Sequence, residues 1–380
     1  MSKEKQQLNK HLKASINHGR YVKIIVCALA LLTTTNLFAQ QAVQDNSKLT
    51  ISGYADIYYG YDFNKPLNNT RPPFVYSYNR TNEVNIDMGY IKAAYANNSM
   101  RANVALMVGT YANANLAAEP GVLKNILEAN AGVKLAKDAN LWLDAGVFSS
   151  HIGFESAIGK DCWTVTRSIL ADNSPYYESG AKLGYTTNDD KFFISALMLN
   201  GWQHIQRPDG NTGLSAGLQV TYKPSDNILI NYSNFYGNDK PDSAKLNRFY
   251  NNLFAVFQLT KKIGLTAGFD FASEQKYKGA STYNYLYSPV FIVRYTPIDK
   301  FAVAARFEYY KDQNGILIKT GTPNGFETTG YSLNVDYSPV KNMLLRVEGK
   351  YYNSKDAIFI ANNFNVNYNT VITTSMEVSF

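Results

Sequence analysis

The sequence contains no long apolar run, few charged residues and few cysteines. Of its 380 residues only 18% are charged, and the two cysteines are Cys27 and Cys162. A helix needs about 20 consecutive apolar residues to cross a bilayer, so a helical membrane protein is excluded. Two cysteines allow at most one disulfide and neither has zinc-ligand spacing, which excludes disulfide scaffolds and zinc modules. The hydrophobic content of 45% argues against general disorder.

Aromatic residues, in contrast, are abundant, with 29 Tyr and 20 Phe against 3 Trp. Tyr and Phe favour the pleated, half-buried surface of a strand. Runs in which apolar and polar side chains alternate recur along the chain, and such a run has one apolar and one polar face because successive side chains of a strand point to opposite sides. In one run Leu49, Ile51, Gly53, Ala55, Ile57 and Tyr59 lie opposite Thr50, Ser52, Tyr54, Asp56 and Tyr58; in another Phe301, Val303, Ala305, Phe307 and Tyr309 lie opposite Ala302, Ala304, Arg306, Glu308 and Tyr310. The sequence therefore predicts an all-β fold.

The connections between these runs are of two kinds that alternate along the chain. Seven are short and contain the Asn, Asp, Pro and Gly of hairpin turns: 96–99, 137–140, 188–191, 224–227, 261–263, 297–300 and 339–342. Eight are long: 62–82, 111–128, 149–178, 201–213, 237–247, 274–282, 311–327 and 353–368. Fifteen connections join sixteen strands. We therefore predict a transmembrane antiparallel up-and-down β-barrel of about 16 strands, with short periplasmic turns and long extracellular loops.

A soluble β-sandwich would also show alternation, but its connections have no reason to be short at one end and long at the other. Aromatic residues cluster at both ends of the predicted strands. Near the short turns are Tyr185, Phe192, Phe193, Tyr222, Tyr295, Phe301 and Tyr337, and near the long loops are Tyr58, Tyr59, Tyr111, Phe148, Trp202, Tyr236, Tyr250, Tyr309, Tyr310, Tyr351 and Tyr352. Two aromatic bands a bilayer apart are typical of the two membrane interfaces, which favours the barrel.

Positive charge is concentrated in residues 1–39, which hold six of the 37 basic residues and one of the 30 acidic residues. A basic segment up to Lys23, an apolar stretch over residues 24–32 and the sequence Leu37-Phe38-Ala39 have the pattern of a secretory signal. The apolar stretch is too short for a permanent membrane anchor. We expect residues 1–39 to be a cleaved signal peptide, residues 40–47 a short periplasmic extension, and residues 48–380 the barrel.

Three stretches carry a resemblance to a known family. They are Ile51-Ser-Gly-Tyr-Ala-Asp-Ile-Tyr-Tyr-Gly-Tyr-Asp-Phe63, then Ala145-Gly-Val-Phe148 with Ile152-Gly-Phe-Glu155, and Ser174-Pro-Tyr-Tyr177 before Ser179-Gly180. Through them residues 48–380 resemble the OmpL-like β-barrel porins of Bacteroidetes outer membranes. The final strand, which ends at Phe380, resembles the terminal sorting signal of outer-membrane barrels. The resemblance implies an outer-membrane location and a diffusion channel.

Strand number bears on function, because about eight strands fill a barrel with side chains whereas about sixteen leave a water-filled lumen. We therefore predict an outer-membrane porin that forms a water-filled channel for passive diffusion of small hydrophilic solutes. Its partners would be outer-membrane lipid and those solutes, with no nucleic acid, and resemblance to general porins implies a homotrimer. Passive passage requires no cofactor, and the sequence contains no convincing nucleotide or metal motif.

The longest predicted connection, residues 149–178, is the third long loop, and in the porins that this sequence resembles the third loop folds inward to form the constriction. Its charged residues are Glu155, Asp161, Asp172 and Glu178 against Lys160 and Arg167. A loop between strands five and six should face strands thirteen and fourteen. Those strands and their neighbours supply the candidate pore-lining residues Arg294, Arg306, Glu308, Asp336, Arg346 and Glu348. Either acidic loop and basic wall set up a transverse field, or a mixed-charge lumen merely stays hydrated.

Two other functional classes remain open. A barrel hydrolase would need a nucleophile and a base within hydrogen-bond reach. Beyond the signal, the chain has only His151 and His204, and neither lies in a motif, so we expect no catalytic residues and no enzyme. The other alternative is a structural or adhesin-type barrel with a plugged pore, which single-channel conductance would distinguish from a porin.

Overall fold

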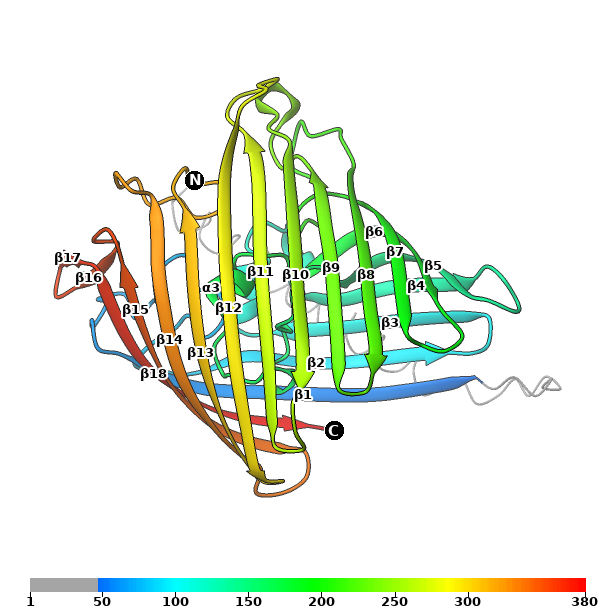
Figure 1. The fold of residues 1–380 in the computed structure, drawn as a ribbon, viewed down its shortest axis with the longest axis horizontal. Helices are drawn as coiled ribbons and strands as arrows, with labels where there is room; N and C mark the ends of the chain where they lie inside the picture. Colours follow the sequence, from blue (N-terminus) through cyan, green and yellow to red (C-terminus); the bar gives the residue numbers. More distant parts are fainter. Residues whose placement is uncertain (1–46) are drawn as a thin grey trace, which may run out of the picture. The chain divides into compact units, whose positions relative to one another are not determined.

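A computed structural model describes residues 47–380, so the signal peptide predicted over residues 1–39 lies outside the described residues. Within residues 47–380, sixteen antiparallel strands close into a barrel (Figure 1). Barrel strands that are consecutive in sequence pair with each other, and the first, β1 (Lys48–Asp62), pairs with the last, β18 (Tyr368–Ser379). The predicted fold class and the number of strands are confirmed.

The strands between these two differ in length along the chain. In order they are β2 (Val84–Ala96), β3 (Met100–Val108), β4 (Ile126–Lys134), β5 (Asn140–Ser149), β6 (Tyr177–Thr186), β7 (Phe192–Leu199), β8 (Ser215–Ser225), β9 (Ile228–Gly237), β10 (Arg248–Gln258), β11 (Ile263–Gln275), β12 (Tyr283–Ile298), β13 (Phe301–Asp312), β14 (Phe326–Tyr337) and β15 (Met343–Ser354). The connections alternate between short and long as the sequence predicts.

The long loops contain the remaining regular elements. The second loop holds α2 (Thr110–Asn115) and η1 (Gly121–Asn125), the third η2 (Gly159–Asp161) and α3 (Ile169–Asp172), and the fifth η3 (Asp242–Ala244). The eighth contains a small hairpin, β16 (Phe359–Ala361) with β17 (Phe364–Val366), which the sequence analysis did not predict. No helix within residues 47–380 is both long and apolar enough to cross a membrane.

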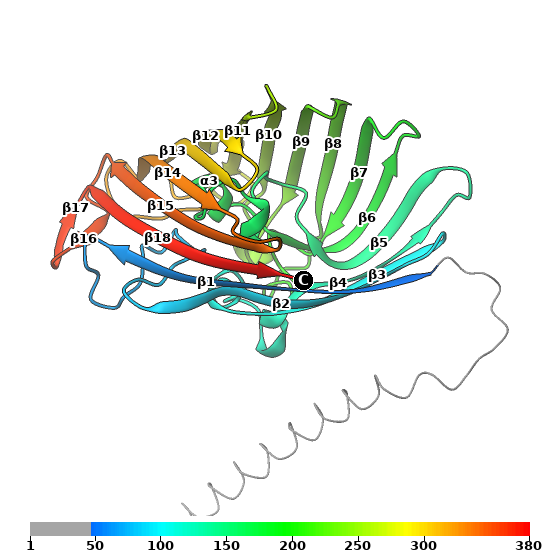
Figure 2. The ribbon, with the colours of Figure 1, turned by 90° about the horizontal axis from the view of Figure 1, so that it is seen from below.

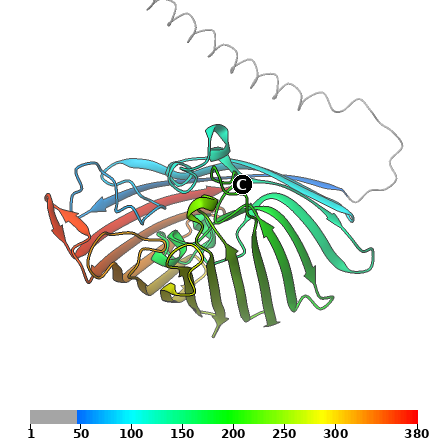
Figure 3. The same cartoon turned by 90° about the horizontal axis from the view of Figure 1, so that it is seen from above.

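The two faces of each strand are separated as the alternation predicts. In β13 the side chains of Ala302, Ala304, Arg306 and Glu308 are buried inside the barrel, whereas the outward-facing Phe307 is 39% exposed. The ring of strands encloses the short helix α3, which is visible inside it in Figure 2, and Figure 3 shows the ring from the opposite direction. Residues from the third loop therefore share the interior with the polar face of the strands.

The barrel closes where β1 meets the C-terminus. The backbone N–H of Gly53 donates to the carbonyl of Phe380 at 2.9 Å, and the N–H of Phe380 donates to the carbonyl of Gly53 at 3.0 Å. A closed ladder leaves no strand edge exposed to lipid, where each unpaired backbone group would cost several kcal/mol.

Near the long loops, the interior contains an apolar core. Side chains at the loop-side ends of the strands, such as Phe235, Tyr250 and Tyr352, pack there with Phe74 of the first loop and Phe359 of the eighth. The prediction that all aromatic residues near the long loops form a lipid-facing band is wrong for Tyr58, Tyr111, Phe148, Tyr250, Tyr310 and Tyr352, which are buried. They occupy inward positions of strands or lie in an infolded loop, so the loops cover them.

Candidate functional site

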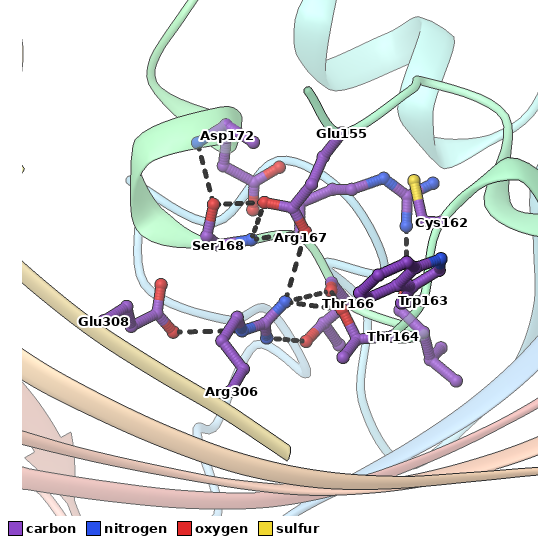
Figure 4. Close-up of polar contacts among 12 residues, drawn as sticks. Glu155, Cys162, Trp163, Thr164, Thr166, Arg167, Ser168, Asp172, Arg306 and Glu308 are labelled. Carbon is purple, nitrogen blue, oxygen red and sulfur yellow. Dashed lines mark hydrogen bonds and ion pairs between the residues drawn. The ribbon is translucent and has the colours of Figure 1, made fainter. Parts of the chain in front are cut away.

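The third long loop, residues 150–176, is held in its conformation by hydrogen bonds within the loop, and those between Glu155 and Ser168 come first (Figure 4). The carboxylate of Glu155 accepts hydrogen bonds from the backbone N–H of Ser168, at 3.0 Å, and from its hydroxyl. The same hydroxyl oxygen accepts from the N–H of Ala171 at 3.2 Å and so caps α3. Serine is a favoured N-cap because its oxygen satisfies an N–H that has no partner in the helix.

Arg167 holds the two arms of this loop together. It is fully buried, and its guanidinium donates to the carbonyls of Ser156 at 2.7 Å, Val165 at 2.5 Å and Ala157 at 3.3 Å. The positive charge also lies 5.7 Å from the centre of the Tyr78 ring, a cation–π distance. Arg167, predicted as a constriction residue, thus serves the internal structure of the loop.

On the opposite side of the barrel, Arg306 of β13 binds the loop. Its guanidinium lies 3.3 Å from the Glu155 carboxylate and donates to the hydroxyl of Thr164 and the carbonyl of Thr166, both at 2.7 Å. It also pairs with Glu348 of β15 at 2.9 Å. Arginine suits this position because its planar group can serve several acceptors at once.

Arg346 of β15 makes a second attachment near η2. It donates to the carbonyls of Gly159 and Cys162, both at 2.9 Å, and pairs with Asp336 at 2.7 Å and Glu377 at 3.2 Å. Because the partners include backbone carbonyls of the loop, this side chain fixes the position of the η2 region against the wall.

Acidic residues of the wall contribute as well. Glu348 accepts from the N–H of Thr166 and Glu308 from the N–H of Ile169, each at 2.5 Å. Lys350 pairs with Glu308 at 3.0 Å. Charges of both signs on the wall are thus used to bind the backbone of the loop, which has few charged side chains of its own at the contact.

An apolar contact accompanies these polar ones. Trp163 and Phe154 pack beside Val290, Ile292 and Ala304 of β12 and β13. Neither aromatic residue can be recognised in the sequence as part of the site, since nothing local distinguishes a loop aromatic that packs inward from one that faces solvent.

The remaining predicted site residues are distributed differently. Lys160 and Asp161 are exposed on η2, and Arg294 of β12 is partly exposed, 4.0 Å from Asp336. Glu178, at the start of β6, is fully buried, and its carboxylate oxygens have no hydrogen-bond partner in the described part of the chain. The groups predicted to face each other across a gap, Glu155 and Arg306, are in contact. The constriction and pore-lining roles of all these residues stay predictions.

Asp172 connects the third loop to the first. Its carboxylate accepts from the N–H of Ser77 at 3.3 Å and from the Ser77 hydroxyl at 2.9 Å. Burial raises the pKa of Asp172 to about 6, although the positive charge of Lys350 and the bonds from Ser77 act in the opposite direction. Removing a carboxylate from water disfavours its charged form, and this effect prevails here.

A second group of charges, not foreseen from the sequence, lies on β2 to β6, strands with which the third loop forms no hydrogen bond. Lys92 of β2 pairs with Glu128 of β4, and Arg101 of β3 pairs with Asp144 of β5, each at 2.6 Å. Lys182 of β6 lies 4.9 Å from the centre of the Phe148 ring and forms no ion pair with any described carboxylate. These residues occupy the polar positions of strands in which polar and apolar side chains alternate. This alternation is the sequence signal that could have revealed them.

A cavity of about 240 Å³ separates the third loop from the part of the barrel wall formed by β3 and β4. Gly153 and Ser156 line it from the loop, and Met107, Leu127 and Glu128 line it from β3 and β4. Within residues 47–380, no three His, Cys, Asp or Glu side chains are placed to hold a metal ion.

Comparisons with known proteins agree with this geometry. Residues 48–380 match the family described as "Putative beta-barrel porin-2, OmpL-like". No curated protein matches the chain.

Solved structures with the same architecture include three outer-membrane proteins. OmpT of Vibrio cholerae is similar with a TM-score of 0.59 at 12% identity, over 89% of this chain and 99% of that chain. An anion-selective porin from Comamonas acidovorans is similar with a TM-score of 0.58 at 10% identity, over 88% of this chain and 100% of that chain. The outer-membrane channel DcaP of Acinetobacter baumannii is similar with a TM-score of 0.57 at 9% identity, over 88% of this chain and 97% of that chain. At such low identity the likeness shows the fold.

Proposed function

Because this chain belongs to the OmpL-like β-barrel porin family, an outer-membrane family, we propose that it is a diffusion channel in which the third loop narrows the passage for small hydrophilic solutes. Family and fold point to a non-enzymatic channel. The residues of the third loop would determine how wide the passage is. The charged residues of β2 to β6 would determine which charges line it.

The observation that carries the proposal is the path of the third loop. It leaves the barrel between β5 and β6 and reaches β13 and β15, with six strands between β6 and β13 along one arc of the ring. A segment attached at both places has to cross the interior. Since Arg306 and Arg346 hold it at the far side, the loop reduces the open cross-section.

The passage that remains would follow β2 to β7, the strands with which the third loop forms no hydrogen bond. The cavity beside Glu128 lies on this side. Lys92, Arg101 and Lys182 face the interior here with Glu128 and Asp144, and this group of five has one more positive than negative charge. Two further inward carboxylates of these strands, Asp87 and Glu178, are 1% and 0% exposed and therefore do not line the passage. Fixed charges of one sign in a narrow passage enrich ions of the opposite sign, so a modest preference for anions is expected.

Single-channel recording on protein purified from outer membranes tests the proposal directly. Stepwise, ohmic conductance in planar bilayers is expected, and liposomes containing the protein should swell with small sugars and amino acids and stop responding as solute size increases. Barrels that insert into the bilayer without any conductance would contradict the channel.

One observation favours a second candidate, a barrel that is closed at its extracellular end. Phe74 of the first loop packs against Phe326, Tyr352 and Phe359, with ring centroids 4.8 to 6.0 Å apart. If this apolar core shuts the mouth, wild-type protein should conduct poorly and Phe74→Ala should conduct more. High conductance of the wild-type protein, unchanged in Phe74→Ala, would eliminate this candidate.

Two further parts of the proposal concern maturation and assembly. Residues 1–39 would be removed after export, which N-terminal sequencing should show as a chain beginning at Gln40. A homotrimer is supported by a related fold, OmpT of Vibrio cholerae in a trimer form, and by the aliphatic outer face of β3, where Val104, Leu106 and Val108 are exposed. Native mass spectrometry of the detergent-solubilised protein would give its oligomeric state.

A further inference from the structure

Arg71, in the first extracellular loop, is a buried arginine that lacks partners. Its side chain is 3% exposed, and all three guanidinium nitrogens have no hydrogen-bond acceptor anywhere in residues 47–380. The other buried arginines of this part, Arg167, Arg248, Arg306 and Arg346, each donate to several oxygens. Burying an unpaired charge is strongly unfavourable, so an arginine in this state points to an anion that binds it.

The charges around Arg71 reinforce this conclusion. Lys350 is near enough for its positive charge to repel that of Arg71. The carboxylate of Asp62 lies in the same region but forms no ion pair with Arg71, because it accepts from the amide of Asn369, at 2.8 and 3.0 Å, and from the N–H of Asn64 at 2.9 Å. Asp62 nevertheless keeps its negative charge, and it lines the cavity described below together with Arg71 and Lys65, so that this lining has one positive charge in excess.

Arg71 also lines a cavity of about 520 Å³ between the first and the eighth loops. Most of its walls are apolar and include Leu67, Ile358 and Ile360, and two of these, Leu67 and Ile360, are 85% and 59% exposed at the surface. Asn369 adds a second polar group whose Oδ1 has no donor among the described residues. An apolar wall beside one unpaired cation suits a ligand with an apolar body and a single negative head.

We propose that this cavity binds an amphiphile whose oxyanion, a phosphate or a carboxylate, pairs with Arg71 while its apolar part lies along Leu67 and Ile358. The guanidinium nitrogens are covered in this conformation, so the side chain turns toward the ligand, and it breaks no hydrogen bond when it does so. Bidentate pairing of arginine with an oxyanion supplies the affinity. The inference goes beyond the proposed function, because none of these residues belongs to the third loop or to the walls of the passage.

Decyl phosphate is a suitable probe, added to protein in dodecyl maltoside micelles. Binding is followed by the ³¹P chemical shift of the probe and by the rise in the thermal unfolding midpoint. Saturable binding to the wild-type protein is expected, with decanol and inorganic phosphate each giving much smaller effects. If decyl phosphate shows no saturable binding to the wild-type protein, or if decanol binds equally well, the proposal is wrong.

Variants then locate the site. Arg71→Met should weaken decyl phosphate binding by about tenfold or more, the effect of losing a charge-assisted pair. Arg80→Met is the matched control, since Arg80 lies in the same loop but is already paired with Glu83 at 2.7 Å. Without probe, Arg71→Met should unfold no earlier than the wild-type protein. Equal affinity of wild type and Arg71→Met would overturn the assignment.

The same oxyanion chemistry could come from a membrane lipid or from a free amphiphile. Protein in phosphatidylcholine nanodiscs, with or without phosphatidic acid, separates these sources. If phosphatidic acid competes with decyl phosphate at this site, the ligand is a phosphorylated lipid; if it does not, the ligand is a free amphiphile.

Discussion

The ring of Phe154 lies directly over Gly268, so that a Cβ atom at residue 268 would overlap Cε1 of Phe154. Trp163 covers Gly264 in the same way: a Cβ atom at residue 264 would stand 2.6 Å from Cη2 of the indole ring. Both glycines lie on the inward face of β11, four residues apart, and their missing side chains leave the space that the two loop aromatics fill.

Replacing Gly268 by valine should displace the third loop. The added side chain overlaps Phe154, and overpacking of this kind costs about 1–3 kcal/mol. The unfolding midpoint should fall and single-channel conductance should rise as the loop leaves the interior. Gly349→Val is the matched control, because nothing lies within 4 Å of a Cβ at Gly349 on the exposed face of β15. Equal conductance in the two variants would count against an inward-folded loop.

Arg306→Met should release the loop by a different route. Glu155 and Glu348 would stay buried without their shared cation, which is expected to cost about 3–5 kcal/mol. Larger and noisier single-channel currents are expected, together with a lower midpoint in denaturant. Arg207→Met serves as control, since Arg207 bonds only carbonyls of its own loop. Unaltered stability and conductance would show that Arg306 does not hold the loop.

Ion preference should depend on Lys182. Lys182→Glu changes the charge of the proposed passage by two units, from a small positive excess to a small negative one. The reversal potential in a salt gradient should shift toward cation preference. The control is Lys262→Glu, which makes the same charge change at an exposed turn between β10 and β11. An identical shift in both variants would assign the effect to overall charge and remove Lys182 from the passage.

Asp172 should make stability depend on pH. Its pKa of about 6 in the folded protein lies above the ordinary value of 3.8, so the folded state keeps a proton that the unfolded chain releases between these values. Its stabilising effect is complete below about pH 4 and is lost as the pH rises through 6. Asp172→Asn does not titrate. In urea unfolding, the free energy of unfolding of Asp172→Asn relative to that of the wild type should therefore increase by on the order of 2–3 kcal/mol from pH 4 to pH 7. If this difference between the two proteins stays constant with pH, the raised pKa of Asp172 is refuted.

Cys162 should report whether the loop is in place. Its thiol is buried, and burial raises the pKa to about 11, so very little thiolate is present at pH 8. Maleimide labelling should be slow in the wild-type protein and much faster in Arg306→Met and Gly268→Val. Urea-unfolded protein gives the upper limit of the rate. Rapid labelling of the folded wild-type protein would mean that the loop opens readily.

The sequence by itself determined the barrel. Period-two alternation, fifteen connections of alternating length and the polar placement of Arg306 and Glu308 can be read from local pattern, because a strand in lipid has to expose one face and shield the other. The topology also placed the third loop opposite β13, since strands that pair in sequence order fix which parts of the ring face each other.

Only the tertiary structure decided what the loop does there. Glu155 and Arg306 are 151 residues apart, and their distance of 3.3 Å follows from how the loop packs, which no local pattern encodes. The inward direction of Tyr250 and Tyr352, the space above Gly264 and Gly268, and the unpaired state of Arg71 were likewise decided there. Composition and periodicity determine which face of a strand is polar, but a polar group's partner is set by the three-dimensional position of every segment around it.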